Sequence, residues 1–255
     1  MRITEHYFPS LDSTNNEAKK MVREHCPEGT VISAGRQTAG RGRRGRQWET
    51  PQDEAVATSI VLYPKLAPEK LSALTLVAAL AVRKAIFDLY GLKSGIKWPN
   101  DLVLKTRKIC GILTEMSVKD QAAEYVVVGI GINVHNRSFP EDLRDRATSL
   151  DLVLEEEQKN GVVTDCGALR EKLWQEFGRY YENFLAHGDL GGLREEYDSY
   201  LLNCGREVRI LDPLGAWEGI ARGINSAGEL LVETPEGVRC VDSGEVSVRG
   251  IYGYV

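Results

Sequence analysis

Long apolar segments are absent from this sequence, and that absence excludes a membrane-spanning helix. No run approaches the roughly eighteen consecutive apolar residues that such a helix requires. Residues 1–7 also lack the basic and apolar regions of a secretory signal peptide. We therefore expect a cytoplasmic protein that does not associate with membranes.

Cysteine and histidine are scarce and scattered. The five cysteines are odd in number and widely separated, and the sequence contains neither a Cys-x-x-Cys pair nor a histidine cluster of metal-ligand spacing. This pattern predicts reduced thiols rather than a disulfide framework or a metal site held by cysteine and histidine.

The sequence also lacks an overall excess of positive charge. The formal net charge is -5 and the pI is about 5.6, which argues against broad electrostatic binding of nucleic acid or a membrane surface. Residues 35–48 nevertheless contain five arginines and four glycines. Positive charge is therefore concentrated in one segment, which we call the Arg/Gly loop.

The composition of the Arg/Gly loop suits an anionic ligand. Glycine lets the backbone approach a ligand closely, and each guanidinium offers a planar fork of donors for carboxylate or phosphate oxygens. Strand-like runs at 29–34 and 55–63 precede and follow the loop, so we expect it to be held between two strands of a sheet. A solvated loop and an RNA-binding segment are the alternatives.

The hydrophobic patterns predict an α+β fold in a chain of 255 residues, which is long enough for one large domain and one small one. The glutamate-rich stretch 155–160 is interpreted as a solvated connector. Beyond Cys204, short strands separated by turns predict a small antiparallel barrel. The expected domains are 1–204 and 205–255. Strands are expected at 2–8, 29–34, 55–63, 95–104, 107–116 and 125–134, and helices at 13–22, 68–90, 165–185 and 190–202.

Two short motifs are consistent with a pocket. Ser13 or Thr14 is expected to cap the first helix, with Glu17 completing a capping box, and the same polar cluster also suits the wall of a pocket for a urea, amide or carbonyl group. The strand at 125–134 contains Gly129 and Gly131, which let a ligand or another group approach its backbone.

Five short motifs resemble the signatures of biotin protein ligases and follow one another in the same order as in that family. The similarity extends over essentially the whole chain. The resemblance implies a mixed sheet flanked by helices, similar to the catalytic domain of class II synthetases, followed by an SH3-like β-barrel. The five motifs are residues 13–15, 40–48, 97–101, 107–113 and 129–133.

The sequence departs from the family pattern in two places. Many bacterial members begin with a helix-turn-helix that represses biotin genes, whereas this sequence begins at the catalytic domain, so we expect a monofunctional form that does not bind DNA. The family also usually has Ser-Pro-x-Gly after the tryptophan of the loop. Here the chain continues through Thr50 and Pro51 into Gln52, Asp53 and Glu54.

The resemblance implies a reaction in two steps. Biotin reacts with ATP, in the presence of Mg2+, to give biotinyl-5'-adenylate and pyrophosphate, and a lysine of a biotin carboxyl carrier protein or carboxylase subunit then accepts the biotinyl group. Catalytic roles are implied for Lys108, Arg43 and Asp101, and a Mg2+ position near Asn100 and Asp101. Biotin contacts are implied for Ser13, Thr14, Asn15, Gln37, Gly40, Arg41, Arg43, Lys108, Gly129 and Gly131. ATP or adenylate contacts are implied for Arg46, Trp48, Lys97, Asn100, Asp101, Asn133 and Arg249.

Other functions are weighed against this one. A lipoate or octanoate ligase or transferase shares the related fold but needs a pocket for a long apolar chain. An RNA-binding protein using the Arg/Gly loop conflicts with the acidic pI, and a silent biotin-binding regulator conflicts with the presence of Lys108 and Asp101. An exposed sheet edge also makes a homodimer possible.

Overall fold

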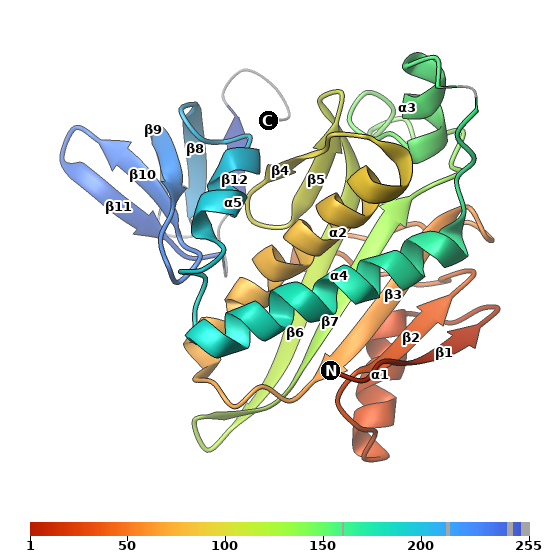
Figure 1. The fold of residues 1–255 in the computed structure, drawn as a ribbon. Coiled ribbons are helices and arrows are strands. Elements are labelled where there is room, and N and C mark those ends of the chain that lie inside the picture. Colours follow the sequence, from red (N-terminus) through yellow and green to blue (C-terminus); the bar gives the residue numbers. More distant parts are fainter. Residues whose placement is uncertain (160, 213–214, 244–246, 251–255) are drawn as a thin grey trace.

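Two sheets organise the computed structural model, which describes residues 1–255 except 160, 213–214, 244–246 and 251–255 (Figure 1). The larger sheet has seven strands in the order β1-β2-β3-β7-β6-β5-β4. Its first pair is parallel and the others are antiparallel, which makes it the mixed sheet that the resemblance implies. The strands are β1 (Thr4–Phe8), β2 (Thr30–Ala34), β3 (Ala55–Leu62), β4 (Gly95–Lys97), β5 (Asp101–Leu104), β6 (Arg107–Lys119) and β7 (Ala122–Asn133).

Helices cover both faces of this sheet. A 3-10 turn at Pro68–Ala73 leads into α2 (Leu74–Tyr90), which is apolar almost all round and packs with α4 (Cys166–His187) across one face (Figure 1). The opposite face packs against α1 (Thr14–Arg23) through Ile32, Val61 and Val127. β3 and residues 126–133 of β7 are therefore buried on both sides, as their β-branched composition predicts.

The second sheet is antiparallel and has the order β11-β10-β9-β8-β12. Helix α5 (Arg194–Tyr200) leads into it, and the Trp98 indole N–H donates to Gly228 O at 3.0 Å, which ties the two sheets together. The five short strands confirm the predicted antiparallel pattern, while barrel closure stays a prediction. The strands are β8 (Glu207–Asp212), β9 (Gly215–Ile224), β10 (Leu230–Thr234), β11 (Gly237–Val241) and β12 (Ser247–Gly250).

One helix was missed by the sequence patterns. Helix α3 (Leu150–Glu156) includes part of the stretch that was interpreted as a solvated connector, and that interpretation is wrong there. The Ser149 side chain accepts a hydrogen bond from the backbone N–H of Leu152, which caps the helix, and Val153 and Leu154 bury one face of it. The glutamates occupy only its exposed end.

Two absences noted in the sequence have structural counterparts. All five cysteines are free thiols, as predicted. Within the described ranges, no helix combines the length and apolarity needed to cross a bilayer.

Candidate functional site

A cavity of about 1200 Å³ opens between the Arg/Gly loop, the start of α1 and one end of the larger sheet. The segment 136–147 forms another wall, and Arg206 and Val248 extend the lining to the second sheet. The structure brings to this cavity nearly all the residues that were predicted from the motifs. They are Ser13, Thr14, Asn15, Gln37, Arg41, Arg43, Arg46, Trp48, Lys97, Asn100, Asp101, Lys108, Gly129, Gly131 and Asn133.

Gly40 is the predicted residue that lies outside this lining among those that the structure describes in full. A Cβ on Gly40 would lie 2.2 Å from the carbonyl oxygen of Trp48, so this glycine lets the Arg/Gly loop close on itself. Arg249 belongs to β12, and its side chain lies outside the described residues.

Protein side chains cover the two glycines of β7. A Cβ on Gly129 would lie 2.0 Å from Asn15 Oδ1, and a Cβ on Gly131 would lie 2.4 Å from the Trp48 indole. Gly131 also pairs with Gly111 on β6, so the indole rests on backbone without side chains. The glycines therefore position Asn15 and Trp48 in the cavity.

The predicted side-chain cap on α1 is wrong. Ser13 occupies the N-cap position without a side-chain cap, and the Thr14 and Asn15 side chains turn toward the cavity wall. Ser59 Oγ, on β3, lies 2.7 Å from both Thr14 Oγ1 and Asn15 Oδ1, and Gln37 Oε1 accepts the backbone N–H of Thr14 at 2.8 Å. The buried hydroxyl of Ser59 thus engages both side chains, and neutral polar side chains line this end of the cavity, with the Arg41 guanidinium beside them.

The other end of the cavity is cationic. Lys108 Nζ lies 2.6 Å from Asp101 Oδ1 and 5.4 Å from the ring centroid of Trp48. Arg43 Nη1 donates to Asn100 Oδ1 at 3.1 Å, and Nη2 donates to the carbonyl oxygen of Ser243, which lies between β11 and β12. Burial lowers the pKa of the Arg43 guanidinium, and the negative charge of Asp101 opposes that shift.

Glu115 is a functional candidate that the motifs did not reveal. Its Oε1 lies 2.7 Å from Lys19 Nζ and 3.2 Å from Arg41 Nη2, and its Oε2 accepts from Asn15 Nδ2 at 2.8 Å. The signal was present in the sequence, because residues 111, 113 and 115 alternate onto one face of the strand that the motif 107–113 begins.

The wall at 136–147 was also missed, because its sequence has no periodic pattern. Lys108 N donates to Arg146 O at 2.7 Å and Thr148 N donates to Lys108 O at 2.9 Å, so backbone hydrogen bonds hold its end against β6. Asn136 is 4% exposed, and its Oδ1 has no hydrogen-bond partner among the described residues. Asn136 is one of the residues that line the cavity.

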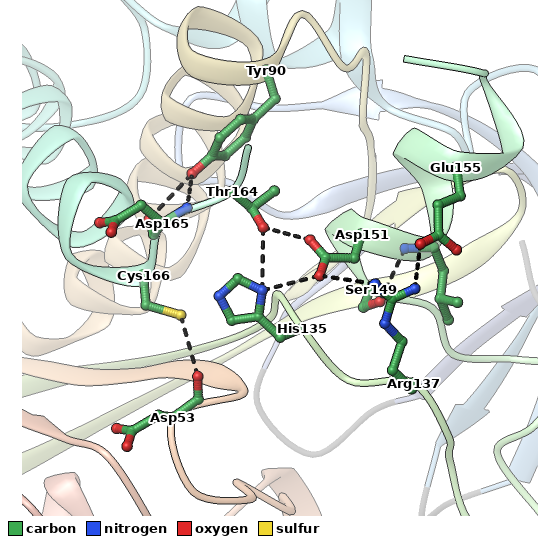
Figure 2. A network of polar contacts seen from close by, with 11 residues as sticks. Asp53, Tyr90, His135, Arg137, Ser149, Asp151, Glu155, Thr164, Asp165 and Cys166 are labelled. Atoms are coloured by element: carbon green, nitrogen blue, oxygen red, sulfur yellow. Dashed lines mark hydrogen bonds and ion pairs between the residues drawn. The ribbon is translucent and has the colours of Figure 1, made fainter. Parts of the chain in front are cut away.

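Figure 2 shows how the start of this wall is anchored. His135 Nδ1 lies 3.1 Å from Asp151 Oδ2 and 3.2 Å from Thr164 Oγ1, while Arg137 contacts Asp151 and Glu155 on α3. The backbone N–H of His135 also donates to Glu54 O at 2.7 Å. The network joins the exit of the Arg/Gly loop to the wall on the other side of the cavity.

Asp53 explains how the chain accommodates its departure from the Ser-Pro-x-Gly pattern. It occupies the glycine position with a φ of 56°, the left-handed conformation that glycine adopts most easily. Its carboxylate accepts from Tyr7 OH at 3.1 Å and from Gln52 Nε2 at 2.7 Å. Burial and the Asp53 contact raise the pKa of the Tyr7 hydroxyl. These bonds hold the loop exit without a glycine.

Two family patterns match the chain. Residues 7–133 match the Biotin/lipoate A/B protein ligase family, and residues 204–249 match the Biotin protein ligase C terminal domain.

Similar proteins match nearly the whole of this chain. The Bifunctional ligase/repressor BirA of Bacillus subtilis (strain 168) is 35% identical over 244 residues, covering 95% of this chain and 73% of that protein. The Biotin--[acetyl-CoA-carboxylase] ligase of Paracoccus denitrificans is 31% identical over 245 residues, covering 94% and 98%. The solved structure of the biotin protein ligase from Aquifex aeolicus in complex with biotin and ATP superposes with a TM-score of 0.80 at 30% identity, covering 96% and 98%.

Proposed function

The chain belongs to the biotin protein ligase family, and we propose that it uses this cavity to activate biotin with ATP and to transfer the biotinyl group to a lysine of a carrier protein. The observation that supports this best is the polarity of the cavity. The neutral polar groups of Thr14 and Asn15 at one end suit the urea ring of biotin, and the cationic end around Arg43 and Lys108 suits a carboxylate that meets a polyphosphate.

In the first step, a biotin carboxylate oxygen attacks the α-phosphorus of ATP. A new P–O bond forms, the bond to the pyrophosphate group breaks, and pyrophosphate leaves with the bonding electron pair. Negative charge on both reactants opposes their approach, so fixed cations stabilise the transition state. Lys108 and Arg43 have that role in this proposal, with Arg46, Lys97, Asn133 and Trp48 binding the nucleotide and Arg249 reaching it from the second sheet.

We propose that Asn100 and Asp101 would hold the Mg2+ that accompanies ATP. These side chains offer the oxygen donors that Mg2+ prefers, and because Mg2+ usually takes its other ligands from water and substrate phosphates, one or two protein donors are enough. When bound, Mg2+ would neutralise phosphate charge. Among the described residues, no cluster of three or more histidine, cysteine, aspartate or glutamate side chains forms a self-sufficient metal site.

In the second step, the amine of the acceptor lysine attacks the carbonyl carbon of biotinyl-5'-adenylate and AMP leaves. A free lysine with a pKa near 10.4 is mostly protonated at neutral pH, so the amine must lose a proton before it attacks. We assign Asp101 to orient this amine and to accept its proton. The proposed acceptor is a biotin carboxyl carrier protein or carboxylase subunit, and the domain division at 204/205 is part of the same proposal.

Residues 38–47 of the Arg/Gly loop are expected to close over the adenylate, because a mixed anhydride must be protected from water. Arg41, Arg44 and Arg46 are exposed and offer trypsin cleavage sites. We expect biotin plus ATP to slow cleavage in this loop at least about fivefold. Cleavage is measured by mass spectrometry of limited digests, with lipoate plus ATP as the control. Equal cleavage rates with and without biotin plus ATP would contradict closure.

ATP–pyrophosphate exchange tests the proposed function directly. Purified protein with Mg2+ is assayed with biotin, lipoate, octanoate or no acid. Biotin-dependent exchange is the expected result. Exchange with only lipoate or octanoate would identify the rival ligase, and the absence of exchange with every acid would reject the activation step.

A further inference from the structure

The amide of Asn15 is held between acceptors on one side and a hydroxyl on the other. Its Nδ2 donates to Glu115 Oε2 at 2.8 Å and lies 3.4 Å from Leu113 O. Its Oδ1 accepts from Ser59 Oγ at 2.7 Å. Asn15 is 4% exposed, lies against the backbone of Gly129 and lines the cavity.

The hydrogen-bonding capacity of these groups determines which way the amide faces. An ionised carboxylate and a backbone carbonyl only accept hydrogen bonds, whereas the Asn15 nitrogen only donates and its oxygen only accepts. The nitrogen must therefore face Glu115 and Leu113. The oxygen then faces Ser59 and lies over the backbone of Gly129, and Ser59 uses only one of its two lone pairs, which leaves the second for a ligand.

Two cations keep Glu115 ionised. Lys19 Nζ and Arg41 Nη2 lie 2.7 Å and 3.2 Å from Oε1, and the Glu115 side chain is 19% exposed. Burial by itself raises the pKa of Glu115, but the hydrogen bonds from Lys19 and Asn15 outweigh burial and hold the pKa below its usual value. The carboxylate is thus an acceptor throughout the physiological range.

We propose that Glu115 is a positioning residue for ligand recognition, which orients Asn15 so that its carbonyl oxygen accepts a urea N–H of biotin. This inference rests on the proposed function. It gives Glu115 a defined contribution to specificity, because a ligand without an N–H at this point leaves the Asn15 oxygen without its second donor.

Substituting Glu115→Gln tests the proposal with almost no change in shape. A glutamine has one side-chain oxygen, which Lys19 and Arg41 both attract, so its amide nitrogen faces Asn15 and forces the Asn15 amide to turn over. Asn15 then presents a donor where biotin also presents a donor. We expect biotin to bind about tenfold more weakly, while the rate of ATP–pyrophosphate exchange at saturating biotin changes less than about threefold. The non-accepting Glu115→Met is expected to weaken binding at least as much.

A double-mutant cycle shows whether the effect passes through Asn15. Biotin affinity is measured by calorimetry for the wild-type chain, Glu115→Gln, Asn15→Ala and the double variant. We expect Glu115→Gln to add less than about a twofold effect in the Asn15→Ala background. Glu124→Gln, which removes a more exposed carboxylate from the same hairpin, is the matched control and is expected to bind as the wild type does.

The outcomes separate this inference from the function on which it rests. Wild-type affinity in both Glu115 variants, or full multiplication of the two single effects in the double variant, would overturn the positioning role while leaving the ligase function intact. Failure of the wild-type chain itself to bind biotin would overturn the proposed function instead.

Discussion

Replacing Lys108 by methionine is expected to lower biotin-dependent ATP–pyrophosphate exchange by about a hundredfold or more. Methionine keeps most of the length and volume of lysine but removes the ammonium group, which lies 2.6 Å from Asp101 Oδ1 at the cationic end of the cavity. Because the transferring phosphoryl group develops charge there in the transition state, the loss should fall on kcat more than on the KM for biotin.

Lys119→Met is the matched control for this experiment. Lys119 ends the same strand, β6, at an exposed position outside the cavity, so its replacement changes the net charge equally without affecting the site. We expect it to retain the wild-type exchange rate. If Lys108→Met also exchanged at within threefold of that rate, Lys108 would have no electrostatic role in activation.

Replacing Gly129 by alanine is expected to have the second large effect. The added Cβ would lie 2.0 Å from Asn15 Oδ1, and three other groups, Ser59, Glu115 and Leu113, hold that amide in place. Asn15 must move, so we expect the affinity for biotin to fall about a hundredfold and the free energy of unfolding to fall by about 1–3 kcal/mol. Calorimetry and urea denaturation measure the two quantities.

Gly178→Ala provides the control for a glycine substitution. Gly178 lies inside α4, and a Cβ there meets no atom within 4 Å. Alanine at that position should raise the free energy of unfolding by about 0.5–1 kcal/mol and leave biotin binding unchanged. A folded Gly129→Ala variant that bound biotin normally would show that the contact between Gly129 and Asn15 does not shape the site.

The elements that could be predicted from the sequence are those whose signal is local. The apolar run of α2, the turn signals between the short strands after residue 205, and the two strands that flank the Arg/Gly loop all appear where their patterns indicate. Helix α3 was missed because the glutamates at its end obscure an apolar face formed by Val153 and Leu154, and no pattern marked the wall at 136–147.

In the site as well, the sequence predicted the residues that form continuous motifs but not the contacts between distant segments. The motifs supply most of the cavity lining, because the loop and strand segments that form it are continuous in the sequence, but the wall at 136–147 lies outside them. What the motifs lacked was the pairing between strands. Ser59 lies opposite Gly129 only through the register of β3 with β7, and Glu115 reaches Asn15 across 100 residues of chain. Such contacts depend on tertiary structure, so the polar cluster at 13–15 was attributed partly to a helix cap.

The packing of Trp48 on Gly111 and Gly131 limits the order in which substitutions can accumulate in this protein. A Cβ at Gly131 would overlap the Trp48 indole at 2.4 Å, and one at Gly111 would lie 3.0 Å from it. While the indole is present, any larger residue at position 131 would therefore clash with it, and few larger residues would fit at position 111. A smaller side chain would have to replace Trp48 first. Only after that substitution could β6 and β7 accept larger residues at positions 111 and 131.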